Sequence, residues 1–143
     1  MKIVWTKDMS VNDKIIDDQH KQIFNELDEI KKKLSDNASI NQLRKEVVVF
    51  VKTVLGHLDY EEAYMKKHKF PAIAGHKRLH DDYRASVEKF KQEFEHPTSK
   101  GVHLNKSRED LMIRTDEFLT NWLSEHILTE DHKYAAYIKK HSK

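Results

Sequence analysis

The chain has 143 residues, with 26 Lys and Arg against 24 Asp and Glu, for a formal net charge of +2. This length fits one domain over residues 1–143, and the balanced charge, with Lys spread along the chain, favours an ordinary solvated surface over a nucleic-acid partner. The absence of Cys excludes disulfides, iron–sulfur clusters and thiolate zinc sites. No apolar leader or 18-residue apolar run is present, so we expect a soluble cytoplasmic protein with no membrane partner.

Three glycines, two prolines and 35% charged residues favour helices joined by short loops. We expect an arm over residues 1–16, pinned by Trp5, and then helices over about 16–34, 40–68 and 72–95. A fourth helix follows the loop "HPTSKGVHLNKS", and a short C-terminal helix lies around "HKYAAYIKK". The fold class is therefore predicted to be all-α, an antiparallel up-down-up-down four-helix bundle with an N-terminal arm and a short C-terminal helix.

Apolar residues at spacings of three and four define the inward face of each predicted helix. The four sets are Ile16, Ile23, Leu27, Ile30 and Leu34; Leu43, Val47, Phe50 and Val54; Ile73, Tyr83, Val87, Phe90 and Phe94; and Leu111, Phe118 and Trp122.

Every one of these apolar stripes is interrupted by a polar residue that faces inward. The interruptions are His20 in the first helix, His57 and Glu61 in the second, His76 and His80 in the third, and His126 in the fourth. One inward histidine is usually a core residue with a hydrogen-bond partner, and a single H-x-x-x-H is weak evidence for a metal. Four helices that each place an interruption inward favour a shared metal site, because inward polar groups without partners are costly.

Asp131 follows His126 by five residues, which on a straight α-helix is about 500° and leaves it roughly 140° away from His126. Both side chains can face the axis only if the helix ends or bulges between them. We predict a break at "ILTED", with Thr129 ending the fourth helix and capping the next turn.

Seven donors exceed the needs of one tetrahedral zinc ion, and five imidazoles do not suit Mg²⁺ or Ca²⁺. Two ions that can each bind six ligands, bridged by the two carboxylates, fit the donor set better. A mixture of imidazole and carboxylate ligands suits iron. If both carboxylates bridge and an oxo or hydroxo group also bridges, an ion with three histidines is full. An ion with two histidines keeps one open position for a small ligand.

The motifs "IDDQHK", "HLDYEEAYM", "HKRLHDDY" and "HILTED" together resemble the hemerythrin family, specifically its prokaryotic single-domain type. The resemblance extends from "VW" at positions 4–5 to "KYAAYI". It departs from the family pattern at Leu58, where Phe is common, and at Asn12, where Gly is common.

The resemblance implies two iron ions (Fe²⁺/Fe³⁺) joined by an oxo or hydroxo bridge. Its implied ligands are His76, His80 and His126 on the saturated iron, His20 and His57 on the open iron, and Glu61 and Asp131 as bridges.

The resemblance also implies reversible binding of O₂, as a hydroperoxide on the five-coordinate iron, for carriage, storage or delivery rather than as an enzyme. An apolar O₂ pocket is implied at Ile23, Leu58, Trp122, Leu123 and Ile127, for which ordinary core packing is an equally compatible interpretation. NO and small anions are alternative ligands, and a monomer is favoured.

Three other interpretations stay open. A di-iron oxidase, peroxidase or ferroxidase is disfavoured because ferritin-like sites use paired Glu-x-x-His motifs, and only Glu93 and His96 have that spacing. An O₂ or NO sensor would need an output domain, and a dizinc structural site remains compatible with the donors. Glu62, Tyr60, Tyr64 and Tyr83 are candidates to orient the ligand imidazoles.

Overall fold

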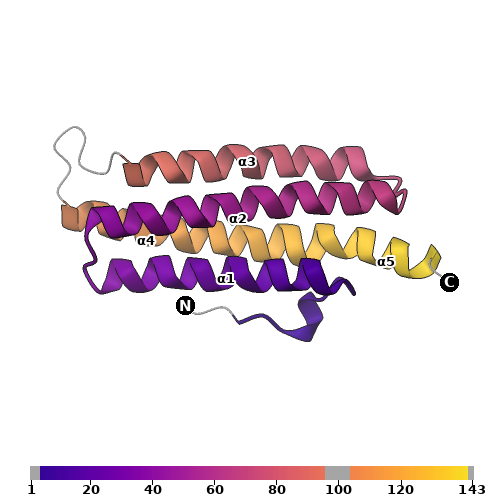
Figure 1. Cartoon of the computed structure of the whole chain (residues 1–143), viewed down its shortest axis with the longest axis horizontal. Helices are drawn as coiled ribbons and strands as arrows, with labels where there is room; N and C mark the ends of the chain where they lie inside the picture. The colour runs from indigo at the N-terminus through magenta and orange to yellow at the C-terminus, as the bar shows by residue number, and fades with distance from the viewer. Residues whose placement is uncertain (1–3, 96–103, 142–143) are drawn as a thin grey trace.

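The computed structural model describes residues 4–95 and 104–141, and in these ranges the chain is helical with no strand. The elements are η1 (Lys7–Met9), α1 (Lys14–Ser35), α2 (Ile40–Lys67), α3 (Ile73–Glu95), α4 (Leu104–Asn121), η3 (Trp122–Asp131) and α5 (His132–His141). Consecutive helices run antiparallel: α1 and α3 point one way, whereas α2 and a composite helix that continues without interruption through α4, η3 and α5 point the other way (Figure 1). The predicted all-α bundle is confirmed.

Local signals in the sequence set the starts of the first two helices. Asp13 caps α1 by accepting a hydrogen bond from the Ile16 amide at 3.0 Å. Ser39 and Gln42 form a reciprocal capping box at the start of α2. The predicted loop after α3 lies mostly in residues 96–103, outside the described residues, and α4 begins at Leu104, inside the segment expected to be loop.

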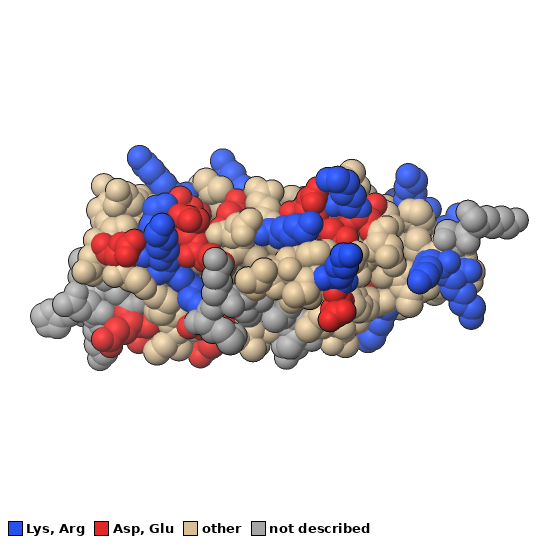
Figure 2. Space-filling model, turned by 90° about the horizontal axis from the view of Figure 1, so that it is seen from below, with Lys and Arg blue, Asp and Glu red and all other residues tan. Residues whose placement is uncertain are grey.

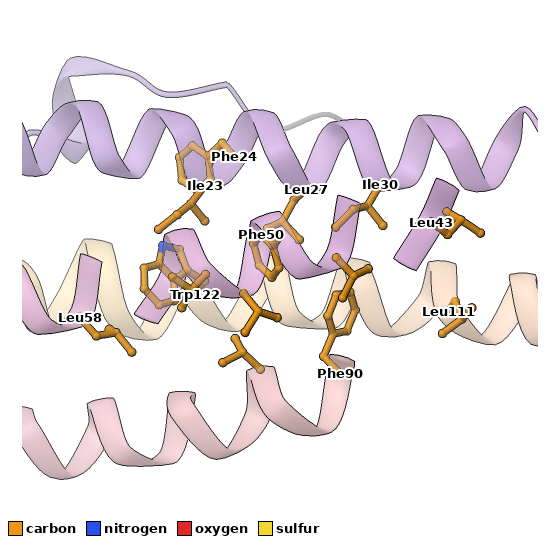
Figure 3. Packing of buried hydrophobic residues seen from close by; sticks show 14 of the residues in the cluster. Ile23, Phe24, Leu27, Ile30, Leu43, Phe50, Leu58, Phe90, Leu111 and Trp122 are labelled. Atoms are coloured by element: carbon orange, nitrogen blue, oxygen red, sulfur yellow. The ribbon is translucent and has the colours of Figure 1, made fainter. Parts of the chain in front are cut away.

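The inward stripes of the first two helices are buried as predicted. All five stripe residues of α1 and all four of α2 are at most 4% exposed, which is the burial expected of a bundle core. All of them except Ile16 join Val87, Phe90, Leu111 and Trp122 in one apolar cluster, whose packing between the helices is visible in Figure 3. The side chain of Phe94 lies outside the described residues.

A second, smaller apolar cluster lies toward the end of the bundle where α5 ends. It contains Val11, Ile16, Met65, Phe70, Tyr134 and Ala135. Along the helices, the polar residues that interrupt the stripes lie between residues of the larger cluster and residues of the smaller one. Apolar packing on both sides therefore holds these helices in register.

The N-terminal arm packs along α1 as expected. Met9 and Val11 are buried, Trp5 packs against the larger cluster, and the Lys21 ammonium lies 4.4 Å from the centre of the Trp5 ring. Trp5 therefore contributes to holding the arm on the bundle. Across the described ranges, none of the helices combines the length and the apolar character needed to cross a bilayer.

The backbone conformation at Asn12 explains why Asn can stand where Gly is common in the family pattern. Its φ of 62° is in the left-handed region, where Gly carries no strain and Asn is tolerated better than most residues.

We expect Asn12→Ala to lower the free energy of unfolding by about 1 kcal/mol, because a Cβ without a compensating polar group is strained there. Asn12→Gly should stay within about 0.5 kcal/mol of the wild type. Urea unfolding of both variants measures this, and equal stability of the two would contradict the explanation.

Candidate metal centre

Seven polar side chains from all four helices of the bundle meet at its centre. They are His20 from α1, His57 and Glu61 from α2, His76 and His80 from α3, and His126 and Asp131 from η3, and each is at most 3% exposed. Their donor atoms form two groups, in each of which all atoms lie within 4.8 Å of one another. Both groups contain Glu61 and Asp131. The structure thus brings together all seven residues singled out from the sequence.

The first group contains three histidines. Glu61 Oε1 lies 2.9 Å from His80 Nε2, 3.0 Å from His76 Nε2 and 3.4 Å from His126 Nε2. Asp131 Oδ1 lies 3.1 Å from both His76 Nε2 and His126 Nε2. One oxygen of each carboxylate therefore faces the three imidazoles.

The second group contains two histidines, and it uses the other oxygen of each carboxylate. Glu61 Oε2 lies 3.2 Å from His57 Nε2 and 3.8 Å from His20 Nε2, while Asp131 Oδ2 lies 3.2 Å from His20 Nε2. The two imidazole nitrogens are 3.1 Å apart. Glu61 and Asp131 therefore lie between the two groups, each with one oxygen toward either side.

The fourth helix solves the spacing problem of His126 and Asp131 without a break. Residues Trp122–Asp131 are wound as a π-helix that continues directly into α5. The predicted end at Thr129 is therefore wrong, and the alternative of a bulge between the two residues describes the structure. In a π-helix residues five apart are about one turn apart, so both side chains face the bundle axis.

Two of the five imidazoles, those of His20 and His126, are held in the neutral form. Burial lowers the pKa of His20, and it lowers the pKa of His126 to about 3, although the Glu61 carboxylate opposes both shifts. These imidazoles are therefore neutral at pH 7, which is the protonation state that binds a metal.

The two carboxyl groups are held in different states. Burial would raise the pKa of Glu61, but the surrounding imidazoles, His57 foremost, hold it well below its usual range. Burial and the nearby Glu61 charge raise the pKa of Asp131 well above its usual value. Two carboxylates this close ionise together only when a cation lies between them.

Unpartnered atoms in the centre test whether a metal fits. Among the described residues, His126 Nε2 and both Asp131 oxygens are buried without a hydrogen bond. His126 Nε2 lies only 3.1 Å from Asp131 Oδ1, yet the two atoms do not form a hydrogen bond with each other. Buried polar atoms are rarely left in this state. Imidazole nitrogens and carboxylate oxygens that converge on shared positions fit transition-metal ions such as iron.

Outer hydrogen bonds fix the orientation of two of the imidazoles and one carboxylate. Gln19 Oε1 lies 2.7 Å from His57 Nδ1, Glu62 Oε2 lies 2.8 Å from His80 Nδ1, and Tyr134 donates to Glu61 Oε2 at 3.1 Å. Such partners set the tautomer and basicity of a metal-ligating imidazole. Of the four residues named from the sequence as candidates for this role, Glu62 makes such a contact, with His80 Nδ1.

Sequence reasoning missed Gln19 and Tyr134. The available signals were the position of Gln19 directly before His20 and that of Tyr134 three residues after Asp131. Tyr64 packs instead against His68 and Tyr134.

Glu62 is itself held by Arg84 on α3. The Arg84 guanidinium bonds to Glu62 Oε2 and also to Asp59 at 2.9 Å and Asp81 at 2.8 Å. Arg84 therefore holds Glu62 in place to accept the Nδ1–H of His80, which directs the Nε2 lone pair of His80 to the centre.

An apolar wall borders the centre, and the ring centre of its Trp122 lies 4.5 Å from that of His126 in the three-histidine group. Ile23, Leu58, Trp122 and Ile127 are fully buried, and the Trp122 ring centre lies 5.6 Å from that of His57 and 6.3 Å from that of His20. These four residues belong to the larger apolar cluster. The side chain of Leu123, the fifth residue of the expected pocket, lies outside the described residues.

Fold and centre define a four-helix metal-binding bundle, and comparison with known proteins gives its family. Residues 11–138 match the Hemerythrin HHE cation binding domain, so the chain belongs to the hemerythrin family. It is 26% identical to a bacteriohemerythrin of Stenotrophomonas maltophilia over 97% of this chain and 83% of that protein. It is 28% identical to a myohemerythrin of Sipunculus nudus over 92% of this chain and 89% of that protein. A crystal structure of wild-type hemerythrin superposes with a TM-score of 0.78 over 96% of this chain and 98% of that chain, at 23% identity, which shows the shared fold.

Glu62 gives a direct test of how the outer hydrogen bonds act on the centre. We expect Glu62→Ala to weaken Co²⁺ binding by about 10- to 100-fold, because His80 loses the acceptor that orients it. Glu62→Gln, which keeps an acceptor oxygen, should lose less. Visible spectroscopic titration of the metal-free protein measures both affinities, with the exposed Glu88→Ala as the matched control. Equal affinity of Glu62→Ala and Glu88→Ala would contradict the assignment.

The low pKa of His126 predicts a pH-dependent contribution to stability. Its folded-state pKa of about 3 lies below the ordinary value of 6.5, so the unfolded chain takes up this proton first as pH falls. The stability that the neutral His126 contributes is complete above pH 6.5 and is lost below it. Between pH 7.5 and 5.0 the metal-free wild type should lose about 2 kcal/mol more than His126→Leu. Urea unfolding at the two pH values measures the difference, and parallel losses in both proteins would contradict it.

Proposed function

We propose that the protein binds O₂ reversibly at a non-heme di-iron centre. In this proposal His76, His80 and His126 hold one iron, His20 and His57 hold the other, and Glu61 and Asp131 bridge the two. The matched family and the relatives named as a bacteriohemerythrin and a myohemerythrin support the proposal. The observation that carries it is the sharing of Glu61 and Asp131 between a three-histidine and a two-histidine group.

The unequal histidine count gives the two positions different roles. With both carboxylates and one bridging oxygen, three histidines complete six ligands, whereas two histidines give five and leave one position open. When bound, the two ferrous ions would supply one electron each to O₂. An open position on one ion suits a small ligand that binds and leaves.

The residues around the open position determine what reaches it. Trp122 and Leu58 are fully buried next to His57, and Ile23 lies one turn beyond His20. These side chains exclude water and therefore the protons that water supplies. The Tyr134 hydroxyl donates a hydrogen bond to Glu61 Oε2. This bond stabilises the negative charge of the carboxylate and holds Oε2 toward the two-histidine group.

The composition of the donor set favours a carrier over an oxygen-activating enzyme. Ferritin-like di-iron sites use four glutamates with two histidines, whereas this centre has five histidines and two carboxylates. Fewer anionic ligands stabilise high-valent iron less, so cleavage of the O–O bond is disfavoured.

The function is tested by cycling the iron-loaded protein between O₂ and argon. The anaerobic diferrous protein should gain a visible absorption band on addition of O₂ and lose it on sparging, through repeated cycles. Asp131→Ala should abolish the band, because one bridge and the unpartnered oxygens of the centre are removed. The exposed His141→Ala should cycle like the wild type. Irreversible oxidation with peroxide release or turnover would replace the carrier proposal with an oxidase or peroxidase.

A further inference from the structure

One end of the bundle carries a strongly basic surface. Residues 63–80, at the end of α2 and the start of α3, and residues 132–141, in α5, contain eight Lys and Arg and no Asp or Glu. We call these eight exposed residues the basic end: Lys66, Lys67, Lys69, Lys77, Arg78, Lys133, Lys139 and Lys140. The rest of the chain then has 18 Lys and Arg against 24 Asp and Glu. The nearly neutral chain is therefore polarised along its long axis.

The two segments of the basic end lie side by side in the fold. The ring centres of Phe70 and Tyr137 are 5.7 Å apart, and those of Tyr64 and Tyr134 are 6.0 Å apart. Figure 2 shows Lys and Arg without Asp or Glu at the end of the molecule where α5 ends. The expectation of a surface without clustered charge, which was based on Lys spread along the chain, is therefore wrong at this end of the molecule.

A surface pocket of about 460 Å³ opens within the basic end and reaches the metal centre. Arg78, Lys133 and Glu130 lie at this pocket with the apolar Phe70 and Leu79, and His76 is also part of its lining. The His76 side chain is 2% exposed, while those of the other four histidines of the centre are fully buried. Glu130, the acidic residue in the lining, is paired with Lys133 at 3.0 Å. His76 is therefore buried but borders this pocket, whose lining includes none of the other four histidines of the centre.

We propose that the basic end is a docking surface for an acidic electron-donor protein, whose electrons reach the metal centre through His76. The inference rests on the proposed function, because a carrier that binds O₂ only in the diferrous state needs a reductant after accidental oxidation. Each encounter oxidises the donor by one electron and reduces one ferric ion to ferrous, so a diferric centre requires two. Complementary charge raises the encounter rate and orients the partner.

The pocket distinguishes this partner from other anionic surfaces. A nucleic acid or an anionic membrane would also be attracted by eight cations, but neither uses a pocket that ends at a ligand of the metal centre. A donor protein needs both features, since charge brings it to this end and the edge of His76 offers a short path into a centre that is otherwise enclosed.

Binding is measured first, on the metal-free protein, so that the result does not depend on O₂ chemistry. Calorimetric titration with an oxidised two-iron ferredoxin of strongly negative net charge should give a dissociation constant that rises with ionic strength. The triple variant Lys67→Glu, Lys77→Glu, Lys140→Glu should weaken binding at least tenfold. The matched variant Lys45→Glu, Lys52→Glu, Lys89→Glu, with the same charge change at exposed positions elsewhere, should stay within twofold of the wild type.

Electron transfer is measured second, by anaerobic stopped-flow mixing of the diferric protein with the reduced ferredoxin. A Cβ at Gly75, which lines the pocket, would meet nothing within 4 Å, so Gly75→Leu is the variant chosen to cover part of the pocket. We expect Gly75→Leu to slow reduction at least tenfold while the far-ultraviolet spectrum and Co²⁺ affinity stay unchanged. Gly56→Leu, whose Cβ also meets nothing within 4 Å, is the control.

The outcomes separate this inference from the proposed function. Ferredoxin binding at the basic end without reversible O₂ binding would overturn the carrier function and leave the docking surface. Reversible O₂ binding together with equal losses in the two triple variants would overturn the docking surface alone. Tighter binding of duplex DNA or of anionic lipid vesicles than of ferredoxin, abolished by the same basic-end variant, would also overturn it.

Discussion

Five imidazoles and two carboxylates lie buried on the axis of a bundle in which the other buried side chains of the described residues, Thr115 apart, are apolar. Away from water, these groups are tolerable only if each lone pair meets a proton donor or a cation. The surrounding residues supply donors for part of the set, through Tyr134 and the imidazoles around Glu61, and leave His126 Nε2 and the Asp131 oxygens without one. The architecture thus concentrates buried nitrogen and oxygen atoms without a hydrogen-bond partner at one place, and the two metal ions that we propose would complete their contacts.

The asymmetry of the centre follows from how the helices contribute their side chains. Helices α1 and α2 give one histidine each to one group, whereas α3 gives two to the other and the fourth helix adds His126. Glu61 and Asp131, from opposite members of the bundle, each direct one oxygen to either group. The π-helix of η3 makes this possible, because only its wider turn lets residues five apart both face the axis.

Much of this arrangement could be predicted from the sequence, since inward histidines interrupt stripes whose period is clear. The stripes of α1 and α2 were enough to predict a helical bundle. Spacings of four predicted that His57 shares a helix face with Glu61, and His76 with His80. Spacing alone does not reveal the local winding, so η3 was predicted as a break at Thr129. Contacts across helices, such as that of Gln19 with His57, depend on the relative rotation of two helices that no single stripe specifies. The basic end likewise exists only because folding brings residues 63–80 and 132–141 together.

We propose that one chain holds two iron ions in unequal coordination. Mössbauer spectroscopy of the anaerobic, iron-loaded protein, combined with metal analysis, tests it most directly. The account predicts two irons per chain and two ferrous quadrupole doublets of equal area, one from the three-histidine position and one from the two-histidine position. A single iron per chain, or two irons with one indistinguishable environment, would contradict it.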